Sequence, residues 1–236
     1  MNAQALYQAG RLDEAVQALG STLRADPANV RARTFLFELL CFAGEFERAA
    51  KQLDIIADSS KEAGMGALLY RSALHGEKIR QQMFQSNSVT SPNVGAPVSG
   101  SLNGQPFRSI ADADARLGPR LEVFAAGQYT LIPFAQLAEV HLEEPKRLRD
   151  LLWAPARVKA GPKFRDFEFG ELLVPVVAPL SWHHPDDQVR LGRAIEWDAA
   201  ADGSEVPLGP KMLQVDEELV PMLDVRDLVI DSTASA

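Results

Sequence analysis

LYQAGRLDEAVQAL, residues 6–19, returns 34 positions later as LCFAGEFERAAKQL, residues 40–53. Five positions are identical in the two stretches: Leu6/Leu40, Ala9/Ala43, Gly10/Gly44, Ala15/Ala49 and Leu19/Leu53. In both stretches a glycine precedes a segment whose apolar residues recur at helical spacing. The sequence therefore predicts helices that are joined in pairs by turns at Gly10 and Gly44.

A period of 34 residues, with a glycine at the turn and an alanine in the following helix, is the tetratricopeptide signature. Such hairpins stack side by side and leave a concave face that binds other proteins. We therefore expect residues 1–85 to form a tetratricopeptide-like repeat domain, and a binding scaffold is favoured over an enzyme. The last helix, residues 61–85, has no complete repeat after it, so we expect the C-terminal part of the chain to cover it.

The charge is unevenly distributed along the chain. Basic and acidic side chains are equal in number over residues 1–85, so the net charge of −8 arises in residues 86–236. An acidic chain without a basic stripe argues against nucleic acid or an anionic membrane as the partner. The single Cys41 excludes an internal disulfide, and neither a secretory signal nor an apolar run of membrane length is visible. We therefore expect a cytoplasmic protein.

The sequence pattern of the second half of the chain predicts short β-strands. Ser, Asn, Gly and Pro dominate residues 86–107, which predicts an interdomain linker. Further on, LEVFA and QYTLIPF on either side of Ala126 and Gly127 predict a hairpin, and short helices are expected at residues 145–152, 186–191 and 217–219. Because strands and helices do not alternate, residues 108–236 are predicted to form a β-rich α+β domain, and the whole chain a multidomain α and α+β protein.

Four C-terminal stretches together resemble one protein family: DADARLGPRLEVF from Asp112, QYTLIPFAQLAEVHLEEPKRLRDLLWAPARV from Gln128, LGRAIEWDAA from Leu191 and KMLQVDEELVPMLDVRDLVI from Lys211. The chain is similar in these stretches to the ImpE/TagJ family of bacterial type VI secretion accessory proteins. The resemblance implies a helical-hairpin domain followed by a β-rich domain, and a role as an adaptor of the contractile sheath. It also implies the small sheath subunit TssB as a partner, together with a part in sheath recycling by the ClpV unfoldase. The family supplies no catalytic residues.

A pair of carboxylates precedes the RLGP turn at residues 116–119. Asp112 and Asp114 are of the type that binds a metal or serves acid–base chemistry. The favoured alternative is that they cap the turn and pair with Arg116 or Arg120.

Two arginines in LRDLLWAPAR can likewise serve either partner binding or internal packing. Arg149 and Arg157 can clamp a partner's carboxylate with two hydrogen bonds each. The favoured alternative is an internal ion pair with Asp112, Asp114 or Glu196.

The only neighbouring histidines lie in Trp182-His183-His184, followed by Asp186 and Asp187. Two His and two Asp suggest a metal site, and a metal-dependent hydrolase is one alternative function. Neighbouring side chains of a strand point to opposite faces, however, so a solvated loop before a short helix is favoured. Because the sequence holds no phosphate-binding loop and no nucleophile or zinc motif, we expect a non-enzymatic protein without a cofactor.

The partner surface is predicted on the first helix of each hairpin, which lines the concave face. Apolar anchors at helical spacing with charges at the rim suit the docking of an amphipathic helix. The predicted partner-binding residues are Arg31, Phe35, Glu38, Phe42, Tyr70, Arg71 and Leu74. Helical periodicity does not distinguish a groove from a core, so core packing of the three aromatic residues remains an equal alternative. A general scaffold or co-chaperone unrelated to secretion is the second function of the binding class.

Overall fold

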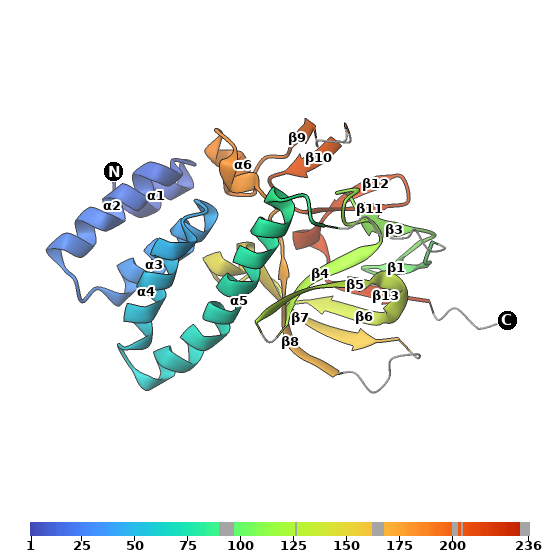
Figure 1. Ribbon diagram of the computed structural model, residues 1–236, viewed down its shortest axis with the longest axis horizontal. Helices are drawn as coiled ribbons and strands as arrows, with labels where there is room; N and C mark the ends of the chain where they lie inside the picture. The colour runs from blue at the N-terminus through green and yellow to red at the C-terminus, as the bar shows by residue number, and fades with distance from the viewer. Residues whose placement is uncertain (90–96, 126, 162–167, 200–202, 204, 232–236) are drawn as a thin grey trace.

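The computed structural model describes residues 1–89, 97–125, 127–161, 168–199, 203 and 205–231. A helical part formed by the first 85 residues lies beside a β-rich part formed by the rest of the described chain (Figure 1). This arrangement confirms the predicted fold class, with tetratricopeptide-like hairpins first and antiparallel strands after them.

The helices of the first part follow the repeat. They are α1 (Ala3–Gln8), α2 (Leu12–Ala25), α3 (Val30–Phe42), α4 (Phe46–Ala57) and α5 (Lys61–Gln85). Gly10 and Gly44 form the turns with φ of 72° and 71°, a left-handed conformation that glycine adopts without strain. Asn29 begins α3 by accepting a hydrogen bond from the Ala32 amide at 3.0 Å. Ala15 and Ala49 are fully buried. Their small side chains let the paired helices approach closely.

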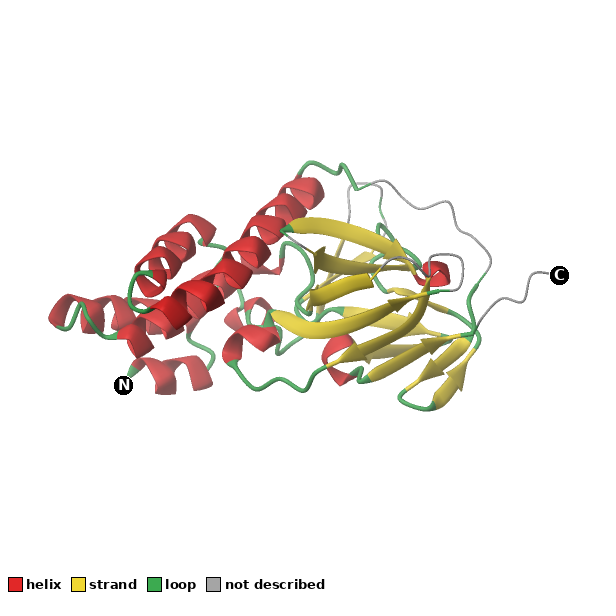
Figure 2. Ribbon diagram, turned by 90° about the horizontal axis from the view of Figure 1, so that it is seen from below, coloured by secondary structure: helices red, strands yellow, loops and turns green. Residues whose placement is uncertain are grey.

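One antiparallel sheet forms the body of the β-rich part (Figure 2). Its strands are β1 (Gly100–Leu102), β2 (Gln105–Phe107), β4 (Arg120–Ala125), β5 (Gln128–Pro133), β6 (Leu137–Leu142), β7 (Trp153–Ala160), β8 (Glu168–Pro175) and β13 (Asp227–Ile230). The spatial order is β2-β1-β13-β6-β7-β8-β4-β5. β4 and β5 form the predicted hairpin, in which Ala125 lies opposite Gln128.

Smaller elements surround this sheet. β3 (Ile110–Asp112), β11 (Met212–Val215) and β12 (Glu218–Pro221) form a second sheet, and β9 (Glu196–Ala199) pairs with β10 (Glu205–Leu208). The short helices are η1 (Phe134–Gln136), η2 (Leu148–Leu151), η4 (Ser181–His183), α6 (Asp187–Arg190) and η5 (Met222–Asp224). The helices expected at residues 145–152 and 186–191 are therefore present as the shorter η2 and α6.

Two predictions of local structure are wrong. Residues 100–107 were assigned to the linker, but they form the β1–β2 hairpin, in which Gly100 pairs with Ile230 of β13. Asn103 and Gly104, which contributed to the Asn- and Gly-rich composition of that range, form the turn of this hairpin, with φ of 50° and 80°. Residues 217–219 were expected to be helical, but residues 218–221 form β12, because pairing with β11 overrides the local helical preference.

The sheet covers the C-terminal half of α5, as expected for an incomplete repeat (Figures 1 and 2). At Gly76 the helix lies so close to β4 that a Cβ there would come within 2.6 Å of the Phe124 ring. The N-terminal half of α5 remains open, and Met65 and Leu68 are 75% and 64% exposed. The described core therefore has two regions. One lies within the β-rich part, and the other joins the helices to side chains of that part, among them Phe124, Trp153 and Leu173 of β4, β7 and β8.

Candidate partner-binding groove

In stacked helical hairpins the first helix of each pair lines the concave face, and here these helices are α1, α3 and the unpaired α5. A groove of about 400 Å³ lies between α1 and α3 on this face. Its lining residues are Gln4, Tyr7, Val30, Arg31, Thr34, Phe35, Glu38 and Leu148. Tyr7 and Phe35 form the apolar floor, with their rings in edge contact at 5.8 Å between centroids.

The seven predicted partner-binding residues separate into three groups. Arg31 and Arg71 are exposed, and Phe35 and Tyr70 are half-buried. Glu38, Phe42 and Leu74 are buried in the chain itself. Arg31, Phe35 and Glu38 come together in the groove, whereas the residues on α5 do not line it.

Phe42 and Leu74 belong to the core, not to the groove. They are 2% and 3% exposed, and both lie in the apolar cluster of the helical part. Their prediction as partner-binding residues is therefore wrong, because a partner reaches neither side chain without opening the core. The alternative of core packing holds for Phe42, and Tyr70 also packs inward against Phe37 and Trp153.

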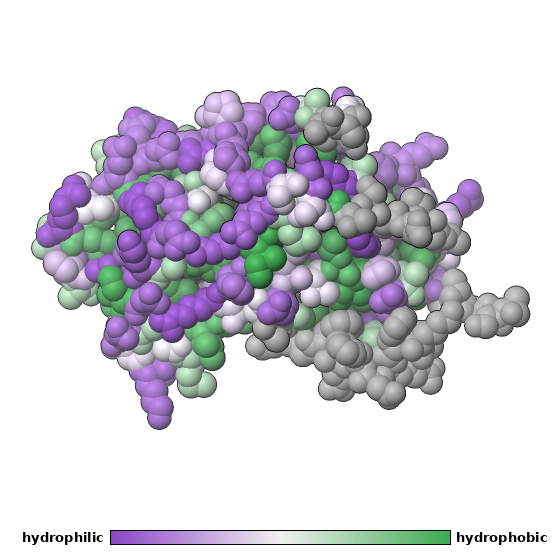
Figure 3. Space-filling model, in the orientation of Figure 1, coloured by the Kyte–Doolittle hydropathy of each residue, from purple (hydrophilic) through white to green (hydrophobic). Residues whose placement is uncertain are grey.

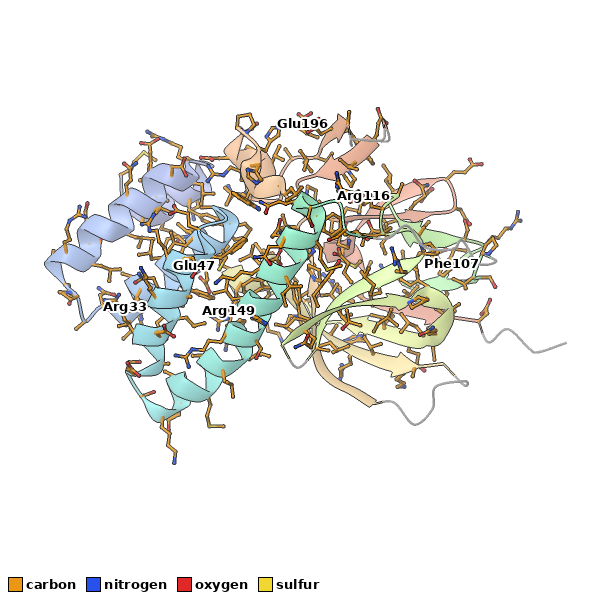
Figure 4. All side chains as sticks on the ribbon, in the orientation of Figure 1. Arg33, Glu47, Phe107, Arg116, Arg149 and Glu196 are labelled. Atoms are coloured by element: carbon orange, nitrogen blue, oxygen red, sulfur yellow. The ribbon has the colours of Figure 1, made fainter. Side chains whose placement is uncertain are left out.

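The chain's own β-rich part contacts two of these helices, α3 and α5. Arg149 of η2 donates to Glu38 of α3 at 3.1 Å, and its guanidinium lies 4.6 Å from the centre of the Tyr70 ring of α5 (Figure 4). Burial raises the pKa of Glu38, and the nearby Arg149 opposes this effect. The favoured internal role of Arg149 is therefore correct, although its partner is Glu38 and none of the three carboxylates that were expected.

A buried network of charges joins α5 to the sheet. Arg80 of α5 is 1% exposed, and it donates to Glu122 of β4 at 2.7 Å and to Glu77 at 3.0 Å. Tyr129 donates to Glu122 at 2.6 Å, and Lys211 forms a further ion pair with the same carboxylate. Although burial by itself raises the pKa of Glu122, Arg80 and Lys211 hold that pKa well below its usual range.

The two predicted carboxylates near the RLGP turn are structural. Asp114 accepts from Arg116 at 2.6 Å, and Asp112 accepts from the Asp114 amide at 3.0 Å, as the favoured alternative expected. Asp112 also pairs with Lys211. Burial and the charge of Glu122 raise the pKa of Asp112 to about 6, against the opposing effect of Lys211.

Arg157 and the histidine-rich stretch also lie outside the groove. Arg157 pairs with Glu143 at 3.3 Å on the surface of the sheet. His183 stacks on Trp182, with the ring centroids 3.5 Å apart, and lies next to Gln85 at the end of α5. Within the described residues, no three His, Cys, Asp or Glu side chains are grouped as metal ligands would be.

Sequence reasoning missed the network around Glu122. Its members lie on different elements, with Arg80 and Lys211 at 42 and 89 residues from Glu122 along the chain, so no local spacing reveals them. One signal was available: Glu122 stands between Leu121 and Val123 in an apolar strand. A charge at such a position requires a buried partner.

The surface gives two further observations. On the face drawn in Figure 3, hydrophilic side chains cover most of the helical part, and apolar residues show only in small areas between them. In the part of the chain that the structure describes, no helix combines the length and the apolar character needed to cross a membrane.

Comparison with known proteins identifies both parts of the chain. Residues 104–229 match the family model described as ImpE protein, and residues 6–69 match that of the tetratricopeptide repeat. The type VI secretion system accessory component TagJ of Pseudomonas aeruginosa is 30% identical over 268 aligned residues, which span 99% of this chain and 92% of that protein. A crystal structure of a Vibrio parahaemolyticus protein superposes with a TM-score of 0.83 at 22% identity, over 97% of both chains, and shows the same fold. The chain therefore belongs to the ImpE family and is a type VI secretion accessory protein of the TagJ kind.

Proposed function

We propose that this protein is a non-enzymatic, cytoplasmic adaptor of the type VI secretion sheath, which binds a helix of the small sheath subunit TssB in the groove between α1 and α3. Through this contact it assists the recycling of contracted sheath by the ClpV unfoldase. Family membership supports the secretion role, and the repeats support binding of another protein.

The groove itself is the observation that carries the proposal. Its apolar floor of Tyr7 and Phe35 is continued by Val30, which is 43% exposed although it is apolar. An amphipathic helix can place its apolar anchors on such a floor and leave its polar face in water. The packing of η2 against α3 and α5 supports this mode of binding, because a short helical segment of the chain itself already docks beside the groove.

The charges around the groove indicate which residues the partner helix carries. Glu38 is already paired with Arg149, so its charge is neutralised within the chain. Arg31 is exposed at the rim of the groove. We therefore propose that the helix carries an acidic residue at its edge, which pairs with Arg31 and sets the direction of the helix.

Binding of purified TssB to purified variants tests the proposal. Val30→Asp places a charge on the apolar floor, and we expect a Kd at least about 10-fold higher, equivalent to about 1.4 kcal/mol. Arg31→Glu reverses the rim charge and is expected to slow association, with a stronger effect at low salt. Arg24→Glu is the matched control for Arg31→Glu, because Arg24 lies on α2 in a separate, polar hollow of the surface.

The outcomes separate the groove from the function. Weaker binding by the two groove variants, with unchanged melting temperatures and an unaffected Arg24→Glu control, supports the proposed site. Equal binding by all variants moves the site away from α1 and α3. If the unaltered protein does not bind TssB when both proteins are folded, the adaptor function itself is refuted.

A further inference from the structure

The histidine- and aspartate-rich stretch lies against the turns of the helical hairpins. We define residues 180–193 as the clamp segment; it contains η4 and α6. Trp182 covers the turn of the second hairpin so closely that a Cβ at Gly44 would lie 2.3 Å from its ring. Gln188 covers the first turn in the same way, and a Cβ at Gly10 would lie 1.8 Å from its amide nitrogen.

The clamp segment also reaches the end of α5. The Leu180 amide and the Trp182 indole both donate to the side chain of Gln81, at 2.9 and 3.1 Å. The clamp segment thus contacts both hairpins and α5, and the residues that it contacts lie nearly 100 positions or more away along the chain. These contacts give the stretch a place in the fold that does not involve a metal.

The first turn of α2 receives its cap from the clamp segment. The residue that precedes α2 is Arg11, which makes no side-chain capping hydrogen bond. Asp187 accepts the hydrogen bond of the Leu12 amide at 2.7 Å instead. Arg190 holds Asp187 at 2.7 Å and reaches Asp13, in the first turn of α2, at 3.0 Å. A negative charge at this position also suits the positive end of the helix dipole.

The last turn of α1 is held by the same segment. Arg193 donates to the carbonyl oxygen of Tyr7 at 2.9 Å, and its guanidinium lies 4.4 Å from the centre of the Tyr7 ring. A cation on the carbonyl end of a helix is stabilising. With six residues, α1 is far too short to be stable without such contacts.

We propose that Asp187 and Arg193 are positioning residues for the groove: they cap α2 and α1 from the β-rich part and thereby hold α1 against α3. Gln4 and Tyr7, the latter also part of the floor, are the α1 residues that line the groove, so the α1 wall of the groove depends on these two caps. The part of this inference that concerns partner binding rests on the proposed function. The part that concerns α1 and α2 does not.

The effect is expected to be local. α3 and α5 begin with caps of their own, from Asn29 and Ser60. Loss of Asp187 therefore removes a cap only from α2, and loss of Arg193 removes a contact only from α1. Neither change touches the helices that carry the remainder of the concave face.

Amide hydrogen exchange of the full-length protein, read by mass spectrometry without any partner, tests the caps. Asp187→Ala is expected to speed exchange in α2, residues 12–25, about fivefold, the typical effect of losing one helix cap. Arg193→Ala is expected to speed exchange in α1, and peptides from α3 and α4 are expected to keep their rates. The matched control is Asp198→Ala, which makes the same change of charge at a residue whose carboxylate, among the described residues, accepts a hydrogen bond only from the neighbouring Ala199 amide.

Three outcomes decide the inference. Faster exchange confined to residues 3–25 supports it. Rates in Asp187→Ala and Arg193→Ala that equal those of the control overturn it. A uniform increase over all helices overturns it as well, since the segment would then support the whole fold and not position α1.

A binding measurement then connects the caps to the groove. Variants with locally faster exchange are expected to bind TssB about fivefold more weakly, because the bound form must first restore the wall of the groove. If the exchange pattern is local but the unaltered protein does not bind TssB, the adaptor function fails while the caps stand.

Discussion

Glu122→Gln is the sharpest test of how the two parts of this protein are joined. The Glu122 side chain is fully buried and accepts from Arg80 of α5, from Tyr129 of β5 and from Lys211. Glutamine has nearly the same shape but no charge, and one of its two terminal atoms is a donor. The change leaves two buried cations short of a counter-ion and places an N–H group against donors.

The expected loss of stability is large for a single substitution. Removing one partner of a buried ion pair typically costs about 3–5 kcal/mol, because the remaining charge stays buried without compensation. Arg80 keeps Glu77 and Lys211 keeps Asp112, so we expect the lower end of this range, about 3 kcal/mol. The surface pair of Arg71 and Asp54, 44% and 61% exposed, provides the contrast. Asp54→Asn is expected to cost at most about 1 kcal/mol, because water already screens that pair.

Equilibrium unfolding in urea measures both variants. Circular dichroism follows the helices, while tryptophan fluorescence follows the junction through Trp153, whose indole donates to Glu77 at 2.9 Å. We expect the Glu122→Gln midpoint to fall with both probes. A loss below about 1 kcal/mol, no larger than that of Asp54→Asn, would refute the reasoning that this network holds α5 to the sheet.

The pH dependence gives an independent check of the same residue. The pKa of Glu122 in the folded protein lies below its ordinary value of 4.5. Its stabilising contribution is therefore present above about pH 4.5 and is lost as the pH falls towards the folded-state pKa. The difference in unfolding free energy between the unaltered protein and Glu122→Gln should accordingly shrink in acid.

Two further predictions follow from the same structure. The pKa of Asp112 is raised from 3.8 to about 6, so its ionised form opposes folding at neutral pH, and this penalty diminishes as the pH falls from above 6 to below 4. Urea titrations at pH 7 and pH 5 should show a gain in relative stability on acidification that Asp112→Asn lacks; equal responses would contradict the raised pKa. Gly44→Ala should destabilise the protein by more than Gly104→Ala, as judged by thermal melting. Both residues have a positive φ, which costs a non-glycine residue about 1–2 kcal/mol, but only Gly44 is covered by the Trp182 ring. Equal losses would show that Trp182 moves away freely.

Local sequence patterns determined the helical part. The 34-residue repeat places Gly10 and Gly44 at turns and Ala15 and Ala49 between helices, and each of these roles depends on neighbours a few positions away. The β4–β5 hairpin was predictable for the same reason, since its two strands are adjacent in the chain. The prediction failed at β1, which was assigned to the linker. Its hairpin with β2 is local, but the hairpin has only three residues in each strand, and its attachment to the sheet depends on β13, more than a hundred residues downstream.

The sequence by itself determined the repeat, the order of the two parts and the family resemblance, because periodicity and motifs are properties of neighbouring residues. Only the tertiary structure decided which apolar residues are free for a partner. Phe35 and Phe42 are seven positions apart on α3, the spacing expected of two apolar anchors on one helix face. Phe35 nevertheless lies in the groove, whereas Phe42 lies in the core. The difference arises because η2 and the clamp segment, far along the chain, cover one end of α3 and leave the other end open.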